Sequence, residues 1–365
     1  MNQEKQSNVE LLRIIAMLFV IAYHIISQSN ALDVVNSDNF VFCVVFHAGG
    51  RMACNIFVMI GAFFLVDLPF RVERITQLYI KTLFACLLVN GFILLTFPHI
   101  TNTSLYFLQF FPIAGKPYWF IQNYIFLLVL SPFLNQILHN NKNNAYIKGL
   151  LFGALVIVAL GSIPLLSTYI PFSNDLVWFV FLYCLMGYLK QHPIRILASK
   201  YTCLLIALMM YSVMCVSVLI FDHLKTMWLH AWEIRFFFVS TYQSFFSFIC
   251  ALCLFYFFVN IRIPTSKIIN VIARHSFGIF ILHQVPILYW DGWVWKYFFK
   301  IDVQFNTPQF IPYCFFVMFA VVIMGMLIDK ILNLFVIKIV GIRPVKCFCA
   351  FVNRNVEGMN NGTCE

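Results

Sequence analysis

The segment from residue 9 to residue 27 reads VELLRIIAMLFVIAYHIIS and is almost entirely apolar, yet it contains Arg13 and His24. A stretch of this length and hydropathy is typical of a transmembrane helix. A bilayer makes ionisable side chains costly, so those kept inside a spanning helix indicate a functional site. The spacing of the two residues is about three helical turns, which places both side chains on one helix face, about 16 Å apart. The segment therefore predicts a fixed cation near one membrane surface and a base near the other.

The composition extends this prediction to the whole chain. Of its 365 residues, 62% are hydrophobic and 10% are charged, and the mean hydropathy is +0.87. These values exclude a soluble globular domain and indicate a polytopic membrane protein with the lipid bilayer as its surroundings. The formal net charge is +10, but the basic residues are scattered through short connections. We therefore expect no nucleic-acid partner.

Hydropathy divides the chain into about ten spanning segments, so the expected fold class is an all-α transmembrane bundle. Two of the segments contain helix-breaking residues, Gly49-Gly50 in the second and Pro286 in the ninth, and we expect both to be bent. The predicted segments cover residues 9–27, 39–66, 77–97, 117–138, 148–170, 174–190, 201–221, 236–259, 267–289 and 310–336.

The distribution of Lys and Arg predicts the orientation. Most of the 24 basic residues fall on the same side of the membrane as the N-terminus, which by the positive-inside rule makes both termini cytoplasmic. Arg13 is then near the cytoplasm and His24 near the outer surface. We expect one integral membrane domain over residues 1–340, followed by a short, basic and mobile cytoplasmic tail over residues 341–365.

Cys250 and Cys253 form a C-x-x-C motif, but it lies inside an apolar segment and has no second pair of ligands. Buried small hydrophobic residues are the favoured interpretation over metal ligands. We therefore predict no metal site.

Four further motifs accompany the pair Arg13 and His24. Together, the five resemble the sequence pattern of acyltransferase family 3, a family of membrane proteins that acylate sugars and other acceptors from acyl-CoA. The resemblance covers essentially the whole chain, with Gly61-Ala62-Phe63 standing where the family has Ser-Gly-Tyr or Ser-Gly-Phe. The further motifs are NIFVMIGAFF at 55–64, RVER at 71–74, YWF at 118–120 followed by Ser131-Pro132, and SFGIFILH at 276–283.

The resemblance implies catalytic roles for His24 and Arg13. A neutral imidazole at His24 would act as the general base on an acceptor hydroxyl, or would carry the acyl group itself. Arg13 would hold the hydrogen-bonding partners of His24 or the thioester donor. The alternatives are a buried structural histidine and an arginine that only extends to the interface.

Arg71 and Arg74 are the candidate binding residues for the cofactor-like donor. Guanidinium groups bind phosphate in bidentate fashion, and the adenosine moiety of CoA is rich in phosphate. The positive-inside rule alone also explains cytoplasmic arginines, so a pure topology signal is the alternative.

Three more residues are expected to line the site: His283, Arg51 and, from the resemblance, Trp119. Arg51 follows two glycines, and a water-lined bend is the alternative to a site contact. Four carboxylates are candidates to orient an imidazole: Asp175, Asp222, Glu233 and Asp291. Asp329, next to Lys330, is instead expected to form an ion pair at the cytoplasmic end of the last segment.

The sequence thus predicts a membrane O-acyltransferase that moves an acetyl group from acetyl-CoA to a hydroxyl of a cell-surface polysaccharide or its lipid-linked sugar precursor. A bacterial inner membrane is the expected location. A transporter or flippase for a polar or lipid-linked solute is the alternative, because carriers also place charges and broken helices at membrane depth.

Overall fold

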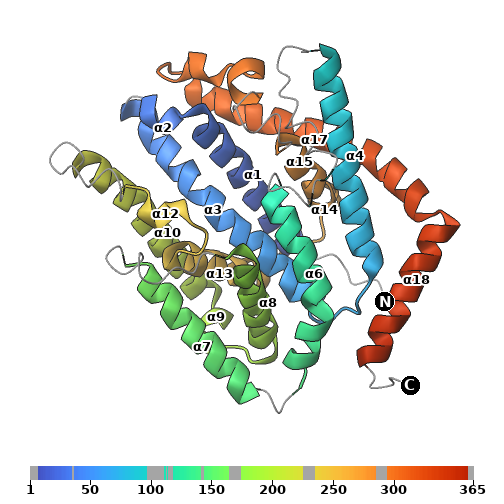
Figure 1. Ribbon diagram of the computed structural model, residues 1–365. Helices are drawn as coiled ribbons and strands as arrows, with labels where there is room; N and C mark the ends of the chain where they lie inside the picture. The colour runs from blue at the N-terminus through green and yellow to red at the C-terminus, as the bar shows by residue number, and fades with distance from the viewer. Residues whose placement is uncertain are drawn as a thin grey trace.

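The computed structural model describes residues 7–34, 37–96, 111, 113, 118–140, 144–163, 174–224, 235–284 and 294–360. Every regular element in these ranges is helical, which confirms the predicted all-α class. Figure 1 shows the helices and their labels. Their bounds are α1 Ser7–Ser29, α2 Ala31–Val34, α3 Ser37–Leu65, α4 Val72–Thr96, α6 Trp119–Leu138, α7 Asn144–Gly161, α8 Asp175–Gln191, α9 Arg195–Ala198, α10 Lys200–Leu224, α12 Phe237–Ser240, α13 Phe245–Asn260, α14 Lys267–Arg274, α15 Ser276–His283, η4 Val294–Phe298, η5 Ile301–Gln304, α17 Phe310–Val340 and α18 Arg343–Asn360.

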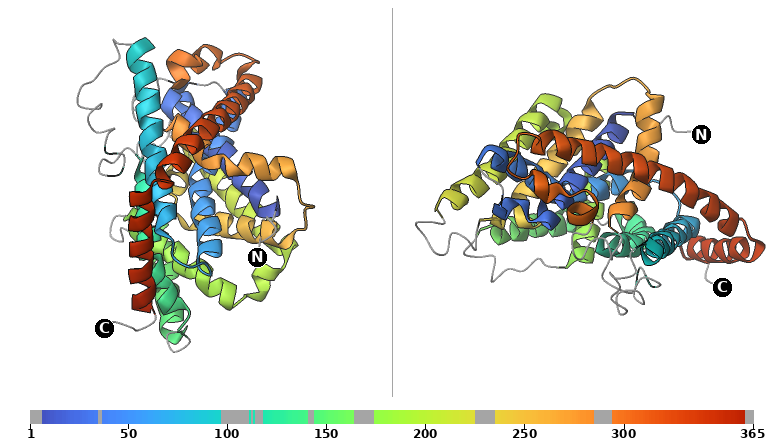
Figure 2. Two further views of the ribbon diagram at one scale, coloured as in Figure 1. Left: turned by 90° about the vertical axis from the view of Figure 1, so that its right-hand side faces the viewer. Right: turned by 90° about the horizontal axis from the view of Figure 1, so that it is seen from above.

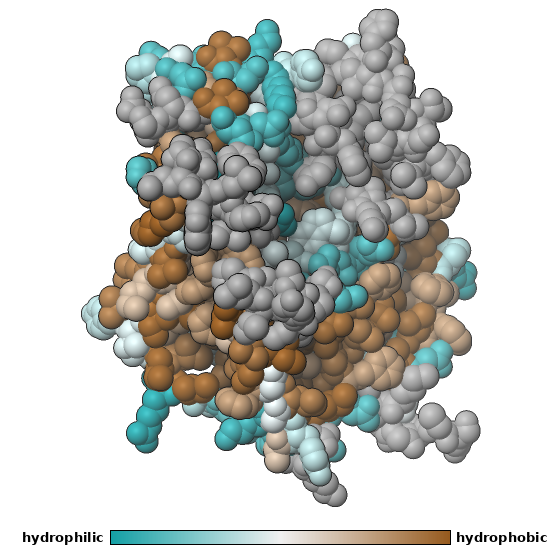
Figure 3. Space-filling view, turned by 60° about the vertical axis from the view of Figure 1, so that its left-hand side comes forward, coloured by the Kyte–Doolittle hydropathy of each residue, from teal (hydrophilic) through white to brown (hydrophobic). Residues whose placement is uncertain are grey.

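Seven of the described helices are long and apolar enough to cross a membrane: α1, α3, α4, α6, α7, α10 and α17. The predicted segment 174–190 corresponds to the 17-residue helix α8, and the segment 236–259 is divided between α12 and α13. A space-filling view shows apolar side chains in a broad belt, with hydrophilic side chains gathered above and below it (Figure 3). The helical membrane bundle is thus confirmed, whereas ten crossings and cytoplasmic termini stay predictions.

Helices α1 and α3 lie side by side at the centre of the molecule (Figures 1 and 2). Helix α3 runs without interruption through Gly49 and Gly50, and the bend expected there stays a prediction. A Cβ atom on Gly49 would lie less than 3.0 Å from the Phe19 ring, and one on Gly50 equally close to Tyr23. The two glycines are therefore the contact that lets α1 approach α3, because small residues allow the closest approach of membrane helices.

The predicted ninth segment is divided at His275, between α14 and α15, whereas Pro286 lies outside the described residues. His275 Nδ1 lies 2.7 Å from Asp329 Oδ2, and the Nζ atom of Lys81 lies 2.6 Å from Asp329 Oδ1. Asp329 is fully buried. The ion pair expected for Asp329 therefore forms with side chains of α4 and of the α14–α15 junction, and Lys330 is exposed.

The tail contains the 18-residue helix α18, although we expected a mobile segment. Asn353 Nδ2 donates to both carboxylate oxygens of Glu73 at 3.0 Å, and its Oδ1 accepts from the backbone N–H of Val72 at 2.9 Å. One asparagine of α18 thus caps the first turn of α4, the turn that carries Arg74.

Candidate active site

Two helix faces carry the candidate residues and converge along their length. On α1, Arg13, Met17 and Val20 line a cavity, and His24 continues the same face one turn further on. On α15, Ser276, Phe277 and Phe280 line the same cavity, and His283 continues that face. The spacing of three or four residues keeps each set on one side of its helix.

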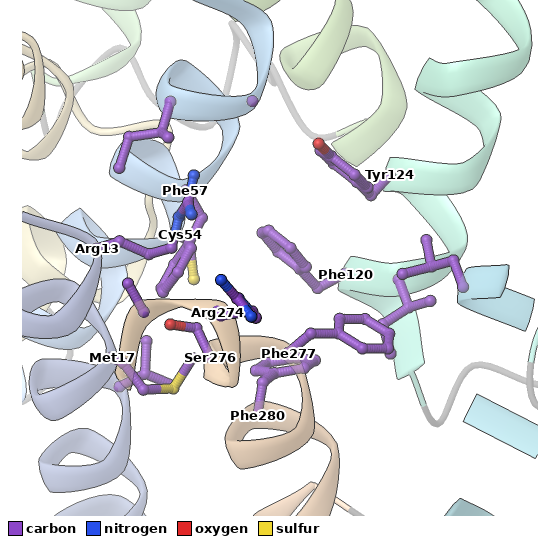
Figure 4. Close-up of a pocket in the computed structure, with 16 residues that line it drawn as sticks. Arg13, Met17, Cys54, Phe57, Phe120, Tyr124, Arg274, Ser276, Phe277 and Phe280 are labelled. Carbon is purple, nitrogen blue, oxygen red and sulfur yellow. The ribbon is translucent and has the colours of Figure 1, made fainter. Parts of the chain in front are cut away.

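The cavity between these faces has a volume of about 390 Å³. Phe57 and Cys54 of α3 and Phe120 and Tyr124 of α6 complete most of its apolar wall, as the close-up shows (Figure 4). Apolar walls with a few placed polar groups are typical of small-molecule sites. Residues of three sequence motifs, at 55–64, 118–120 and 276–283, thus meet at this cavity.

Two arginines face this cavity. Arg13 donates to Glu10 at 2.6 Å, and its side chain is partly exposed. Arg274, the last residue of α14, is exposed, and its side chain lies between Cys54 and Phe120 in Figure 4. Because Arg274 is exposed, the cavity opens to the surface at the end where the two cations lie.

A pair of histidines, His24 and His283, lies next to the cavity wall without lining the cavity. The ring of Phe280, in the cavity wall, lies 6.0 Å from the ring of His283, and the rings of His283 and His24 lie 5.4 Å apart, between centroids. His283 is 2% exposed. The structure therefore brings together two of the predicted site residues, His24 and His283.

Hydrogen bonds fix both imidazole rings. Gln28 Nε2 lies 2.9 Å from His24 Nδ1, and Gln28 Oε1 accepts from Trp295 Nε1 at 2.5 Å. His283 Nδ1 donates to the carbonyl oxygen of Ile279 at 2.7 Å. The Nε2 atom of His283 is buried and has no hydrogen-bond partner among the residues that the structure describes.

Arg51 does not line the cavity but lies near the histidine pair, through Tyr23. Its guanidinium carbon is 5.0 Å from the centroid of the Tyr23 ring, and that ring is 5.1 Å from the ring of His24 in an edge contact. A cation held over an aromatic face is a stable arrangement inside an apolar protein. Arg51 is thus a positive charge near the histidine pair, on a helix that continues past it.

Arg74 lies at a second, smaller cavity of about 280 Å³, together with Gln77 and Lys81. Leu78, Tyr124 and Phe277 line both cavities, so the two adjoin. The guanidinium of Arg74 donates to the carbonyl oxygen of Pro69 at 3.0 Å. Arg71, just before α4, is exposed and lines neither cavity.

Trp119 does not line the main cavity. Its ring stacks on Tyr242 at 5.2 Å, while the next residue, Phe120, forms part of the cavity wall. The Tyr242 hydroxyl donates to Asp175.

Of the candidate carboxylates, Asp175 is thus engaged by Tyr242, and Asp222 pairs with Arg235 at 2.7 Å. Glu233 and Asp291 lie outside the described residues.

Sequence reasoning missed three residues of this site: Arg274, Gln28 and Trp295. Arg274 is one of the basic residues that the positive-inside rule alone explains, although only His275 separates it from the motif that carries His283. Gln28 could have been found from the sequence, because it follows His24 by four residues and shares its helix face. Trp295 comes from a distant segment, and no local pattern links it to α1.

A family model described as an acyltransferase domain matches residues 6–327, a range that contains every residue of both cavities except Asn333 and Val336. No curated protein and no solved structure matches the chain.

Proposed function

The chain belongs to acyltransferase family 3, and from this premise we propose that it is a membrane O-acyltransferase that moves an acetyl group from acetyl-CoA to a hydroxyl of a cell-surface polysaccharide or its lipid-linked precursor. The family match supports the acyltransferase activity. The donor, the acyl group, the acceptor and a bacterial inner membrane are parts of the proposal.

One observation carries the proposal: a single cavity is lined by two arginines, and one of its wall residues, Phe280, contacts a pair of histidines. Acyl-CoA has the same polarity, with phosphates at one end and a reactive thioester at the other. Arginine forks suit phosphate, and an imidazole suits a hydroxyl that must lose its proton.

In the proposed orientation the donor enters from the cytoplasm. Arg13 and Arg274 at the cavity mouth, with Arg74 and Lys81 in the adjoining cavity, supply cations for its phosphates. Arg71, which is close to Arg74 in sequence, would attract the phosphates before the donor enters the cavity. The pantetheine arm would run along the apolar wall past Phe280 and present the thioester to the histidines.

The reaction needs one general base and a positive charge near the thioester carbonyl oxygen. The acceptor oxygen attacks the thioester carbonyl carbon, a C–O bond forms, the C–S bond breaks, and the hydroxyl proton passes through an imidazole to the leaving thiolate. The sequence-based prediction assigns this imidazole to His24. The charge of Arg51 would stabilise the oxyanion that develops on the carbonyl oxygen.

The test uses the purified protein in lipid vesicles with radiolabelled acetyl-CoA and extracted surface glycan or lipid-linked sugar. We expect release of the free CoA thiol together with label in the glycan, and loss of both in the His24→Ala variant. His139→Gln, an exposed histidine that pairs with Asp67 at 3.8 Å, is the matched control. Movement of unmodified lipid-linked sugar across the vesicle without CoA release would favour a flippase instead.

A further inference from the structure

The hydrogen bonds around Gln28 decide which way its amide group faces. The indole N–H of Trp295 can only donate, so the atom 2.5 Å from it must be the amide oxygen of Gln28. The amide nitrogen then faces His24 Nδ1 at 2.9 Å. This orientation follows from the network and does not depend on distinguishing oxygen from nitrogen by position alone.

The orientation of Gln28 fixes the proton on His24. An amide NH₂ group can only donate, so His24 Nδ1 must accept and carries no proton. In the neutral ring the proton is then on Nε2. The basic nitrogen of His24 is therefore the one that Gln28 contacts, and its N–H group is on the other side of the ring.

His283 has the opposite arrangement. Its Nδ1 atom lies 2.7 Å from the carbonyl oxygen of Ile279, which can only accept, so Nδ1 carries the proton. The lone pair is then on Nε2, which is buried and has no hydrogen-bond partner in the described part of the chain. Buried polar atoms are normally satisfied, and one that is not requires an explanation such as a catalytic role.

We propose that the two histidines have different roles in the reaction and that Gln28 determines the role of His24. His283 Nε2 takes the proton of the acceptor hydroxyl, and the Nε2–H group of His24 donates to the thioester carbonyl oxygen. Gln28 is a positioning residue, because it acts only through His24. This inference rests on the proposed function and moves the role of general base from His24, where the sequence-based prediction put it, to His283.

The proposed step is balanced. The acceptor O–H bond breaks as its proton moves to His283 Nε2, a C–O bond forms, and negative charge builds on the carbonyl oxygen near the His24 N–H. When the tetrahedral intermediate collapses, the C–S bond breaks. The thiolate then takes the proton from the His283 imidazolium, which restores both rings.

Nitrogen-15 NMR of histidine-labelled protein in lipid bilayers tests the assignment without any substrate. We expect an unprotonated Nδ1 for His24 and an unprotonated Nε2 for His283, identified by difference from His24→Gln and His283→Gln. In Gln28→Glu, the carboxylate can only accept a hydrogen bond, so the proton of the neutral His24 ring should move to Nδ1. An unprotonated Nε2 on His24 in the wild type would overturn the proposal.

Activity gives a second, independent readout, with octyl glucoside as the hydroxyl probe and hydroxylamine as a nucleophile that needs no base. His283→Gln should lower transfer to the glucoside by about 10²- to 10⁴-fold but retain hydroxamate formation, whereas His24→Gln should lose both. Full glucoside transfer in His283→Gln would refute its role as the base. If the wild type uses neither probe and also leaves the extracted surface glycan unlabelled, the proposed function is refuted, while the NMR result still decides the proton positions.

Discussion

Replacing Gly50 with alanine is the sharpest test of how α1 and α3 are held together. The added Cβ would lie less than 3.0 Å from the side chain of Tyr23, and the obstructing atoms include the Tyr23 Cβ, which no rotamer change can move. The helices must therefore shift apart. Overpacking of this kind costs about 1–3 kcal/mol, which exceeds the gain of up to about 1 kcal/mol from replacing a helical glycine with alanine.

Gly91 is the matched control for this substitution. It also lies inside a long apolar helix, but a Cβ there has no atom within 4 Å. We expect Gly91→Ala to keep or raise the thermal midpoint and Gly50→Ala to lower it. The measurement is thermal unfolding in detergent, followed with a thiol-reactive fluorophore, because cysteines such as Cys43 and Cys250 are buried until the chain unfolds.

The same substitution should also reduce acyl transfer, because Tyr23 directly precedes His24 and its ring contacts the His24 ring at 5.1 Å. If Gly50→Ala and Gly91→Ala show equal midpoints and full activity, then α1 and α3 do not pack through Gly50, and our explanation of the close contact between the two helices is wrong.

Three further predictions concern the reaction. His24→Ala should lower acyl transfer by at least about 10²-fold with normal membrane insertion, whether His24 acts as the base or as the N–H donor to the carbonyl oxygen; retention of more than about a third of the activity would contradict a catalytic role. Arg274→Ala should weaken CoA binding about 10-fold in calorimetry with little change in kcat, since one charge-assisted bond to an exposed group is lost far from the thioester; Arg71→Ala and Arg74→Ala should act in the same direction, and Arg195→Ala, exposed and away from both cavities, should not. In sealed vesicles with the cytoplasmic face outward, added acetyl-CoA should acylate acceptor trapped inside, whereas sealed right-side-out vesicles should respond only after permeabilisation; an equal response of both would exclude donor entry from the cytoplasm.

The fold class was predictable because the hydropathy of each segment by itself determines whether that segment is stable in a bilayer. The break at His275 was not, since nothing in the sequence around it interrupts a helix. At the break, His275 contacts Asp329, which also pairs with Lys81; both partners belong to other helices, and these contacts exist only in the folded bundle. The helix contact at Gly49 and Gly50 was not predictable for a related reason, because glycine suits both a bent helix and a close helix contact.

The candidate site was predictable where one helix carries it. The period of α1 places Arg13 and His24 on one face, and both lie along the path from the cavity mouth to the histidine pair. Arg274 and Trp295 were not predictable, because their relation to α1 depends on which helices pack together. A cation at the end of a short helix reads as a topology signal until the neighbouring cavity is known.

The buried link from Lys81 to Asp329 has a consequence for how the protein is made. Lys81 enters the membrane early in synthesis with α4, and the carboxylate that neutralises it arrives only with α17, the last long apolar helix described. A buried charge without its partner is strongly destabilising. Nascent chains therefore carry an unneutralised lysine in the bilayer until α17 docks, and chains truncated before α17 should be recognised and degraded by membrane proteases.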